Sequence, residues 1–568
     1  MTSRRVCGRV LQTILISALG LALCAKEPVR ATHGMVVAQE ANAADVGLKV
    51  LRDGGNAIDA AIAVGFALAV THPVAGNLGG GGFMLVRLAD GETTFLDFRE
   101  AAPGKASHDM YLDKDGNPTR ESIFGWRSSG VPGSVAGFEA AHKKFGSLPW
   151  ANLLSPAIKL AQDGFTVTAQ FADSLQAKNN PIHTDSESRR IFLRDGNPYK
   201  AGENFKQPEL AVTLQRIAKH GAREFYEGET AKQLATDMAA HGGLIALDDL
   251  RKYKVIEREA LSGDYRGFHI ITSPPPSAGG VGLLQMMGML NGTNYESAGP
   301  DSPKAVHYEA EAMRRFYADR SQYLGDPDFY NVPLKPLLDP AYLAWRRTSI
   351  DPTHATPSEM IEPGLPRAQT AGVRWFESSE TTHYNVVDSK GNAVAVTYTL
   401  NNSYGNGITA PGLGFLLNDE MDDFVAQPGS PNMFGMVGGE ANAIEPGKRP
   451  LSSMMPTIIT KNDKLFMVVG APGGAKITTG VTQVILDVLD FHMNVQDAVD
   501  LPRFHHQWRP DFLYLQTGFP IQTRIALEQM GYQTKETEGV ARVEAVVVSN
   551  GVLEGGTESR LHGKVAGY

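Results

Sequence analysis

Thr381 is the residue of this chain best suited to nucleophilic chemistry, and it opens the segment Thr-Thr-His-Tyr-Asn-Val-Val-Asp at 381–388. A threonine hydroxyl alone is a weak nucleophile, but a free α-amine on the same residue can act as its base. Such an amine has an ordinary pKa of about 7.7–8, so it accepts a proton near neutral pH. We therefore predict that the chain cleaves itself between Glu380 and Thr381.

The residues after Thr381 read as a β-hairpin, with strands over 381–387 and 393–400 and a turn over 388–392. If Val387 faces Ala393, then Thr381 faces Thr399, with Cβ atoms about 4.5–5.5 Å apart. Thr399 could then hold Thr381 in one rotamer. His383 lies on the same strand face as Thr381, because side chains alternate along a strand. Threonine is common in strands, so the hairpin alone favours purely structural roles for these side chains.

Helical and strand patterns alternate along the rest of the chain. Apolar spacing and capping residues predict helices at 39–51, 56–70, 150–162, 303–317 and 479–492. Further strands are expected at 83–88, 93–98, 455–460, 464–470 and 542–549. Several strand pairs are joined by short turns, and no linker divides the chain. The pattern predicts one compact domain with two antiparallel sheets covered by helices.

The composition is that of a globular protein. The chain has 568 residues, of which 42% are apolar and 20% are charged. It carries 53 basic and 62 acidic residues, for a net charge of −9. This balance argues against nucleic acid or an anionic membrane surface as a partner.

The N-terminus has the pattern of a secretory signal peptide. Arginines at 4, 5 and 9 precede an apolar stretch over 10–23 that is too short to span a bilayer. We expect a signal over 1–25, cut after Ala25 or as late as Ala31, and export to the periplasm or beyond the cell. Lipidation of Cys24 is the weaker alternative because Leu23 is large. The other cysteine is Cys7, so the exported chain would form no disulfide framework.

Eight segments together resemble the γ-glutamyltranspeptidase family. They lie in order at 77–83, 97–103, 317–328, 381–384, 397–401, 417–424, 448–454 and 470–474. The resemblance implies an α+β fold, the four-layer αββα sandwich of N-terminal-nucleophile hydrolases. It also implies one compact domain built from two autoproteolytic fragments, a large one over 26–380 and a small one over 381–568, which form a heterodimer.

The resemblance implies a role for each matching residue. Thr381 would attack the γ-amide of glutathione or another γ-glutamyl compound, with Thr399 in support, and water or an amino acid or dipeptide would accept the glutamyl group. The backbone N–H groups of Gly473 and Gly474 would stabilise the oxyanion. The remaining matches would bind the glutamyl zwitterion: Arg99, Ser452 and Ser453 its carboxylate, and Asn401, Glu420 and Asp423 its ammonium. Taken singly, each of these residues has an ordinary structural explanation.

The other motifs say less about function. The glycine run at 79–82 lacks a following Lys-Ser/Thr and precedes a strand, which argues against nucleotide binding. His505 and His506 are interpreted as structural histidines, and neither a cofactor nor a metal is expected. The segment 425–447 resembles a lid loop, with Phe434 at the gate position. Two departures from the family pattern are Glu558-Ser559-Arg560, where Asp-Pro-Arg is usual, and Glu420, where some bacterial members have glutamine.

Two alternatives remain open on the sequence. A glutaryl-cephalosporin acylase of the same fold would cleave an acyl amide without an α-amino group. The acidic cluster argues against it, because unpaired carboxylates beside a neutral acyl chain are costly. A periplasmic peptide-binding protein without catalysis would fit the signal and the charge, and it would remain one intact polypeptide.

Overall fold

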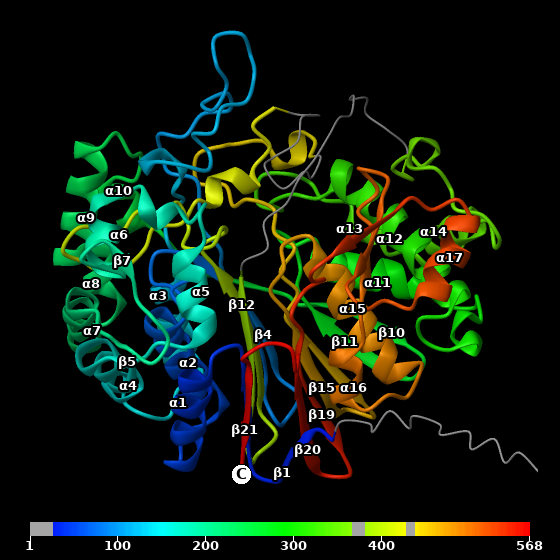
Figure 1. Cartoon of the computed structure of the whole chain (residues 1–568), viewed down its shortest axis with the longest axis horizontal. Helices are drawn as coiled ribbons and strands as arrows, with labels where there is room; N and C mark the ends of the chain where they lie inside the picture. The colour runs from blue at the N-terminus through cyan, green and yellow to red at the C-terminus, as the bar shows by residue number, and fades with distance from the viewer. Residues whose placement is uncertain (1–26, 366–380, 428–437) are drawn as a thin grey trace, which may run out of the picture.

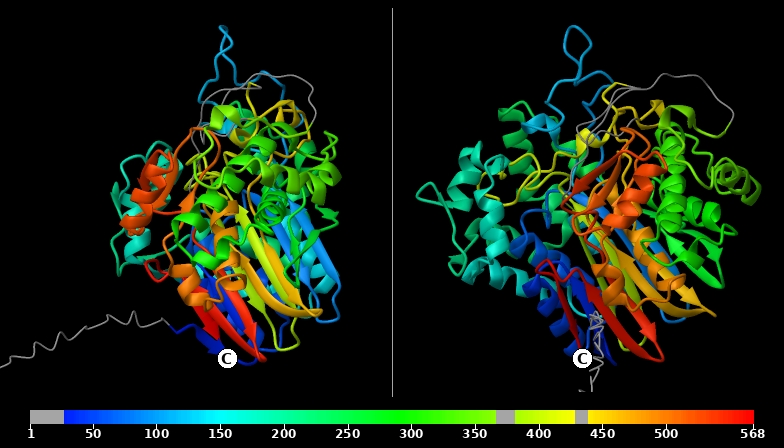
Figure 2. Two further views of the ribbon diagram at one scale, coloured as in Figure 1. Left: turned by 90° about the vertical axis from the view of Figure 1, so that its right-hand side faces the viewer. Right: turned by 45° about the vertical axis from the view of Figure 1, so that its right-hand side comes forward.

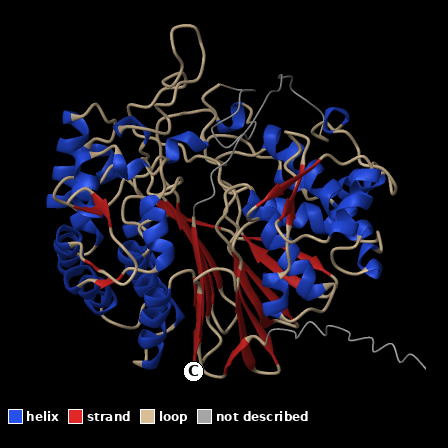
Figure 3. Cartoon of the chain, in the orientation of Figure 1, coloured by secondary structure: helices blue, strands red, loops and turns tan. Residues whose placement is uncertain are grey.

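The computed structural model describes residues 27–365, 381–427 and 438–568. Two seven-stranded antiparallel sheets stack face to face, and helices cover their outer sides (Figure 1, Figure 3). The predicted four-layer sandwich of helix, sheet, sheet and helix is therefore confirmed. In the described ranges, no helix combines the length and the apolar character needed to cross a membrane.

The first sheet has the strand order β1-β20-β19-β15-β14-β11-β10. Its strands span, in that order, Val29–Ala31, Val552–Thr557, Glu544–Ser549, Lys464–Gly470, Thr457–Lys461, Phe268–Thr272 and Leu261–Tyr265. The second sheet has the order β21-β2-β12-β13-β3-β4-β9. Its strands span Lys564–Gly567, Met35–Ala38, Thr382–Val387, Ala393–Thr399, Gly81–Arg87, Thr93–Phe98 and Ile256–Arg258. Both sheets interleave strands from before and after residue 381, so a cut there would leave the two halves hydrogen-bonded together.

Helices cover the second sheet on one side of the molecule (Figure 1, Figure 2). The layer against the sheet comprises α1 (Ala41–Arg52), α2 (Ala57–Thr71) and α3 (Ser134–Phe145), and α4 (Trp150–Asp163) packs on α2. Beyond it lie α5 (Ala169–Gln176), α6 (Ser186–Phe192), α7 (Pro208–His220), α8 (Ala222–Glu227), α9 (Glu229–Ala240) and α10 (Leu247–Lys252). Two short ribbons accompany them: β5 (Phe165–Thr166) with β8 (Asn204–Phe205), and β6 (Leu193–Arg194) with β7 (Asn197–Pro198).

The opposite helical layer covers the first sheet. It contains α11 (Gly279–Leu290), α12 (Pro303–Tyr323), α13 (Leu334–Leu337), α14 (Pro340–Thr348), α15 (Lys476–Leu489), α16 (Val495–Asp500) and α17 (Ile521–Gln529). A small third sheet joins β16 (Phe504–His505), β17 (Leu513–Gln516) and β18 (Thr534–Thr537).

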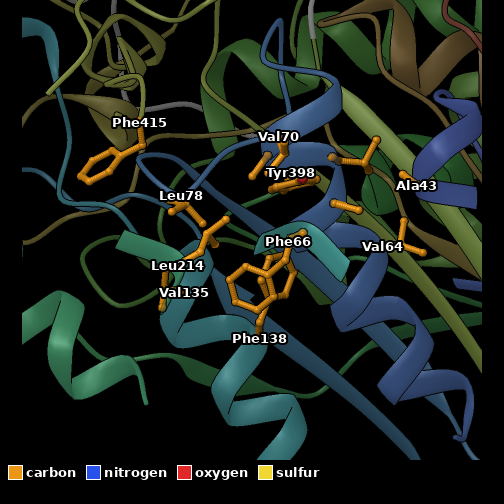
Figure 4. Packing of buried hydrophobic residues seen from close by; sticks show 14 of the residues in the cluster. Ala43, Val64, Phe66, Val70, Leu78, Val135, Phe138, Leu214, Tyr398 and Phe415 are labelled. Carbon is orange, nitrogen blue, oxygen red and sulfur yellow. The ribbon is translucent and has the colours of Figure 1, made fainter. Parts of the chain in front are cut away.

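Helix α2 shows how the sequence builds the layer behind β12 and β13. Asn56 caps the helix in a reciprocal capping box with Asp59, and every residue of α2 is buried. Phe66 packs against Phe138 with ring centroids 5.2 Å apart, and Phe138 packs against Tyr398 of β13 at 5.7 Å (Figure 4). These rings fix the outer face of β13, so the other face of that strand is free to carry polar groups.

The predicted elements agree closely with the observed ones. The hairpin has the expected register, with Val387 paired to Ala393 and Thr382 to Tyr398. Strand β12 begins at Thr382, one residue later than predicted. Helix α12 continues past the predicted end at 317 to Tyr323, because its buried face carries on, and α15 spans Lys476–Leu489 instead of 479–492. The alternation of side chains is also as expected, since odd-numbered residues of β12 face the other sheet.

Candidate active site

Strand β12 lies in the second sheet, and its labelled end meets the loops at one end of the sandwich (Figure 1). Thr381 directly precedes β12 and is 5% exposed. Thr399 ends β13, and its Oγ1 accepts a hydrogen bond from the backbone N–H of Asn401 at 2.9 Å. Asn401 has a left-handed backbone with φ of 78° and donates from Nδ2 to the carbonyl of Asp419 at 3.0 Å. The register, continued by one residue, sets Thr381 opposite Thr399.

A hydrogen-bonded chain lies on the same face of the hairpin. His383 Nε2 is 3.0 Å from Asn385 Oδ1, and Asn385 Nδ2 donates to the carbonyl of Glu544 at 2.8 Å. Because that amide oxygen can only accept, Nε2 carries the proton and Nδ1 accepts from Thr397 Oγ1 at 2.8 Å. Burial lowers the pKa of His383 to about 3, so the ring is neutral. His383 therefore holds the two strands together as a neutral, hydrogen-bonded ring.

Glycines let other segments approach the hairpin closely. A Cβ on Gly470, at the end of β15, would lie 2.2 Å from Cε1 of His383. A Cβ on Gly80 would lie 2.0 Å from the carbonyl oxygen of Thr399. That carbonyl also accepts from Asn77 Nδ2 at 2.8 Å. The glycine run at 79–82 thus serves close packing beside Thr399.

The buried Arg99 and Glu420 and the partly buried Asp423 form one charged cluster. Arg99 follows β4 and is 1% exposed, and its Nη1 lies 2.5 Å from Glu420 Oε1. Its Nη2 pairs with the Asp423 carboxylate, and its Nε donates to the carbonyl of Pro450 at 3.3 Å. Glu420 Oε2 has no hydrogen-bond partner among the described residues. The predicted binding groups for the two charges of a zwitterion therefore meet in one place.

Glu100 also belongs to this cluster, although the sequence predicts no role for it. Its fully buried carboxylate lies 3.5 Å from Nη1 of Arg99. Burial raises the pKa of Glu100 to about 7, and burial likewise raises the pKa of Glu420 well above its ordinary range. Burial alone would lower the pKa of Arg99, but the surrounding carboxylates raise it, so Arg99 stays charged. Three carboxylates thus surround one guanidinium.

Arg449 and Asp97 tie the segments of this cluster together, and we call their ion pair the Asp97–Arg449 anchor. Arg449 Nη1 lies 2.5 Å from Asp97 Oδ1, and Asp97 Oδ1 also accepts from the backbone N–H of Arg99 at 3.0 Å. Arg449 precedes Pro450, whose carbonyl bonds Arg99. Arg258 occupies the second oxygen of Asp97, with its Nε 2.7 Å from Oδ2. Asp97 and Arg449 belong to the sequence motifs at 97–103 and 448–454, but only the fold shows that these two motifs are joined by an ion pair.

The two serines predicted to bind the carboxylate lie in the same segment, shortly after Pro450. Ser452 donates its backbone N–H to Pro276 and accepts at Oγ from the N–H of Met454 at 3.0 Å. Ser453 is 7% exposed, and its Oγ has no hydrogen-bond partner among the described residues. Asn442 links this segment to the acidic one, since Nδ2 donates to the carbonyl of Asp423 and Oδ1 accepts from the N–H of Leu451. The serines therefore lie on a strand-like segment that is held beside the cluster.

Gly473 and Gly474 form the turn between β15 and α15. Their φ angles are 136° and 58°, which favour glycine in both cases. Gly473 also packs so closely on Ala541 that a Cβ would lie 2.8 Å from its Cα. Because Gly470 touches His383, this turn lies at the same end of the sandwich as Thr381. The fold thus brings the turn and the hairpin together.

The remaining predicted features fall outside this group. Phe434 lies outside the described residues. His505 Nδ1 is 2.9 Å from Thr479 Oγ1, and His506 Nε2 is 3.1 Å from the Asp511 carboxylate. In the described part of the chain, no group of three histidine, cysteine or acidic side chains is arranged to hold a metal ion.

Solved structures of known proteins share the fold of this chain. A cephalosporin acylase from Bacillus halodurans superposes with a TM-score of 0.85 at 28% identity, over 96% of this chain and 97% of the other. Helicobacter pylori γ-glutamyltranspeptidase gives a TM-score of 0.57 at 43% identity, over 58% of this chain and 96% of that chain. The fold is that of the N-terminal-nucleophile hydrolases.

The sequence comparison then defines the family. The γ-glutamyltranspeptidase family matches residues 43–568, and the chain belongs to that family. The glutathione hydrolase proenzyme of Escherichia coli (strain K12) is 47% identical over 95% of this chain and 93% of its own length. An acylase ACY 1 proenzyme of Pseudomonas sp. (strain V22) is 36% identical over 91% of this chain and 90% of its own.

Proposed function

We propose that this chain is a γ-glutamyltranspeptidase that hydrolyses glutathione and transfers its γ-glutamyl group. The observation that carries the proposal is the charged cluster of Arg99, Glu420 and Asp423. This cluster lies in a chain that matches the family over residues 43–568. A γ-glutamyl group is a zwitterion at its far end, so it needs both a cation and an anion. On binding, its carboxylate would pair with Arg99 and its ammonium with the two carboxylates, which replaces one set of ion pairs by another.

The proposed chemistry needs only residues of this chain. The amine of Thr381 takes the proton of its own hydroxyl as the oxygen attacks the γ-carbonyl. The carbonyl C–N bond breaks, the amine leaving group takes up the proton, and a γ-glutamyl ester of Thr381 remains. Water or an acceptor amine then attacks the ester, and the Thr381 oxygen regains a proton. Backbone N–H groups at Gly473 and Gly474 would stabilise the oxyanion in both steps, and Thr399 would hold Thr381 in place.

The nucleophile requires a cut before Thr381, which gives fragments over 26–380 and 381–568. The word proenzyme in the names of several relatives supports this cut. The sheets support it as well, because their interleaved strands would keep the two fragments associated as a heterodimer. Residues 1–25 lie outside the described residues, and we propose that they direct export to the periplasm.

Cleavage and activity are tested together on the purified chain. We expect two fragments on a denaturing gel, an intact mass that locates both cuts, and release of nitroaniline from γ-glutamyl-p-nitroanilide. Thr381→Ala should remain whole and inactive. Thr382→Ala is the matched control, because its Oγ1 has no hydrogen-bond partner among the described residues and lies on the opposite face of β12. An uncut chain with full activity would refute the proposed nucleophile.

The acylase relatives make a glutaryl amidase the second candidate. The geometry favours the γ-glutamyl substrate, because a glutaryl group would take Arg99 and leave the buried Glu420 and the partly buried Asp423 without a cation. Parallel assays with γ-glutamyl and glutaryl p-nitroanilides separate the two activities. A preference for the glutaryl compound would favour the acylase.

A further inference from the structure

One peptide group of the glycine run lies between two buried asparagine side chains. Asn77 Oδ1 accepts from the backbone N–H of Gly80 at 2.9 Å, and Asn418 Nδ2 donates to the carbonyl of Gly79 at 2.7 Å. That carbonyl and that N–H belong to the same planar peptide group. The two asparagines therefore hold the opposite ends of one rigid unit. We call this peptide group and the side chains of Asn77 and Asn418 the 79–80 brace.

One end of the brace supports the nucleophile hairpin. Asn77 Nδ2 donates to the carbonyl of Thr399 at 2.8 Å, and Thr399 lies opposite Thr381 in the continued register. The same nitrogen donates to the carbonyl of Ala75 at 2.9 Å, and Oδ1 also accepts from Ser134 Oγ at 2.7 Å. Asn77 is 3% exposed, so its amide uses its two donors and two acceptor positions inside the protein. Its orientation toward Thr399 is therefore fixed.

The other end of the brace supports the charged cluster. Asn418 Oδ1 accepts from the backbone N–H of Glu420 at 3.0 Å, which closes a turn of two residues. The same side chain accepts from the N–H of Gly130 and donates to its carbonyl, both at 2.8 Å. A Cβ on Gly130 would lie 3.0 Å from Cβ of Glu100, so this segment packs on the cluster. Asn418 thus fixes the backbone at Glu420 and the segment beside Glu100.

Neither glycine of the central peptide group has room for a side chain. A Cβ on Gly79 would lie 2.2 Å from the carbonyl oxygen of Leu416, and one on Gly80 would lie 2.0 Å from that of Thr399. Both obstacles are backbone atoms, which cannot rotate away as a flexible side chain can. The peptide group is therefore packed against both supported segments as well as hydrogen-bonded to them.

We propose that Asn77 and Asn418 are positioning residues that set the nucleophile and the donor-binding cluster at a fixed distance from each other. The inference rests on the proposed function and adds two residues to it. Asn77 acts through Thr399, which supports Thr381, and Asn418 acts through Glu420. A misplacement of reacting groups by about 1 Å can cost about 100-fold in rate. Because the two asparagines act at opposite ends, their loss changes different kinetic quantities.

The first test uses Asn77→Ala. Release of nitroaniline from γ-glutamyl-p-nitroanilide in the first turnover, followed at increasing donor concentration, gives a limiting rate and a half-saturating concentration. We expect the limiting rate to fall about 10–100-fold, while the half-saturating concentration changes by about twofold or less. Cleavage before Thr381 should also slow, because it uses the same hydroxyl. A wild-type limiting rate and wild-type cleavage in Asn77→Ala would overturn the role of Asn77.

The second test uses Asn418→Ala and Asn418→Ser. In the alanine variant we expect the half-saturating donor concentration to rise about five- to tenfold, as for the loss of one hydrogen bond, while cleavage before Thr381 is unchanged. Asn418→Ser should recover most of the donor affinity, because a serine hydroxyl can accept from an N–H two residues on. Asn77→Ser should stay as slow as Asn77→Ala, since its side chain is one atom too short for Thr399. Unchanged half-saturation in Asn418→Ala would overturn the role of Asn418.

Asn180→Ala is the matched control for both tests. Asn180 is 7% exposed, donates to the carbonyl of Ser174 at 2.8 Å and accepts from the N–H of Ile182 at 3.0 Å, all within the outer helical layer. It should leave the cleavage rate and both kinetic quantities unchanged. Equal changes in all three alanine variants would refute the inference, because lost stability would then explain them. Circular dichroism shows which variants fold, and the serine variants carry the same comparison if an alanine variant does not.

The outcomes separate this inference from the proposed function. If the wild-type chain cleaves itself but releases no nitroaniline, the proposed function fails, and the role of Asn418 in donor binding fails with it. Slower cleavage by Asn77→Ala than by Asn180→Ala would still support the role of Asn77. If the wild-type chain does release nitroaniline and the asparagine variants match it, only the positioning roles fail.

Discussion

Replacing Arg449 with methionine tests how the binding cluster is held. Arg449 is 4% exposed, pairs with Asp97 at 2.5 Å, and donates to the carbonyl oxygens of Asp97 and Lys254 at 2.8 and 2.6 Å. Removing one partner of a buried ion pair costs about 3–5 kcal/mol of unfolding free energy. The same change removes the ion pair that ties the Pro450 segment to Asp97, which loosens the hold on Arg99 and Ser453 although Arg99 Nε still donates to the Pro450 carbonyl.

The expected kinetic effect is a higher KM for the γ-glutamyl donor. If misplacement of Arg99 forfeits one charge-assisted hydrogen bond to the substrate carboxylate, about 1.5–3 kcal/mol is lost. KM then rises about 10–150-fold. The turn at Gly473 lies between β15 and α15, on a different segment from this anchor, so kcat should change less than KM. Steady-state kinetics with γ-glutamyl-p-nitroanilide and denaturant unfolding measure the two effects separately.

Arg258→Met is the matched control for this prediction. Arg258, on the edge strand β9, pairs with the other oxygen of Asp97 at 2.7 Å and with Asp328 at 2.8 Å, whereas Arg449 belongs to the segment whose Pro450 carbonyl bonds Arg99. It should lower the unfolding free energy while changing KM much less than Arg449→Met does. Equal KM increases in the two variants would refute the reasoning, because stability alone would then explain both.

Three further predictions follow from single contacts. The folded pKa of Glu100 is raised to about 7 by burial, so its contribution to stability is present at low pH and is lost as pH rises toward 7 and above. Thermal unfolding of Glu100→Gln between pH 5 and 8 should therefore show a shallower decline than wild type, and parallel curves would contradict this. Gly470→Ala would place a methyl group 2.2 Å from His383. We expect it to lower the unfolding free energy by about 1–3 kcal/mol and to impair cleavage before Thr381. An unchanged melting temperature together with complete cleavage on a gel would show that the two strands move apart easily. Phe434→Ala should raise the donor KM if Phe434 gates the site, whereas unchanged kinetics in both half-reactions would exclude a gate.

The sequence by itself determined the local structure around Thr381. Strand alternation and the turn at Asp388 were sufficient to predict the hairpin register, because both depend on neighbouring residues only. The eight ordered motifs likewise identified the family and most of the residues that now lie together. Boundaries were less well determined, as at α12, because the end of a helix depends on how far its buried face continues to find partners.

Only the tertiary structure decided how these residues combine. Arg99 pairs with Asp423, which lies 324 positions away, and no periodicity or spacing relates two such residues. The role of Glu100 and the Asp97–Arg449 anchor follow in the same way from packing between distant segments. Hydrophobic patterns specify which face of an element is buried, but the partners of buried charges are set only when the layers assemble and exclude water.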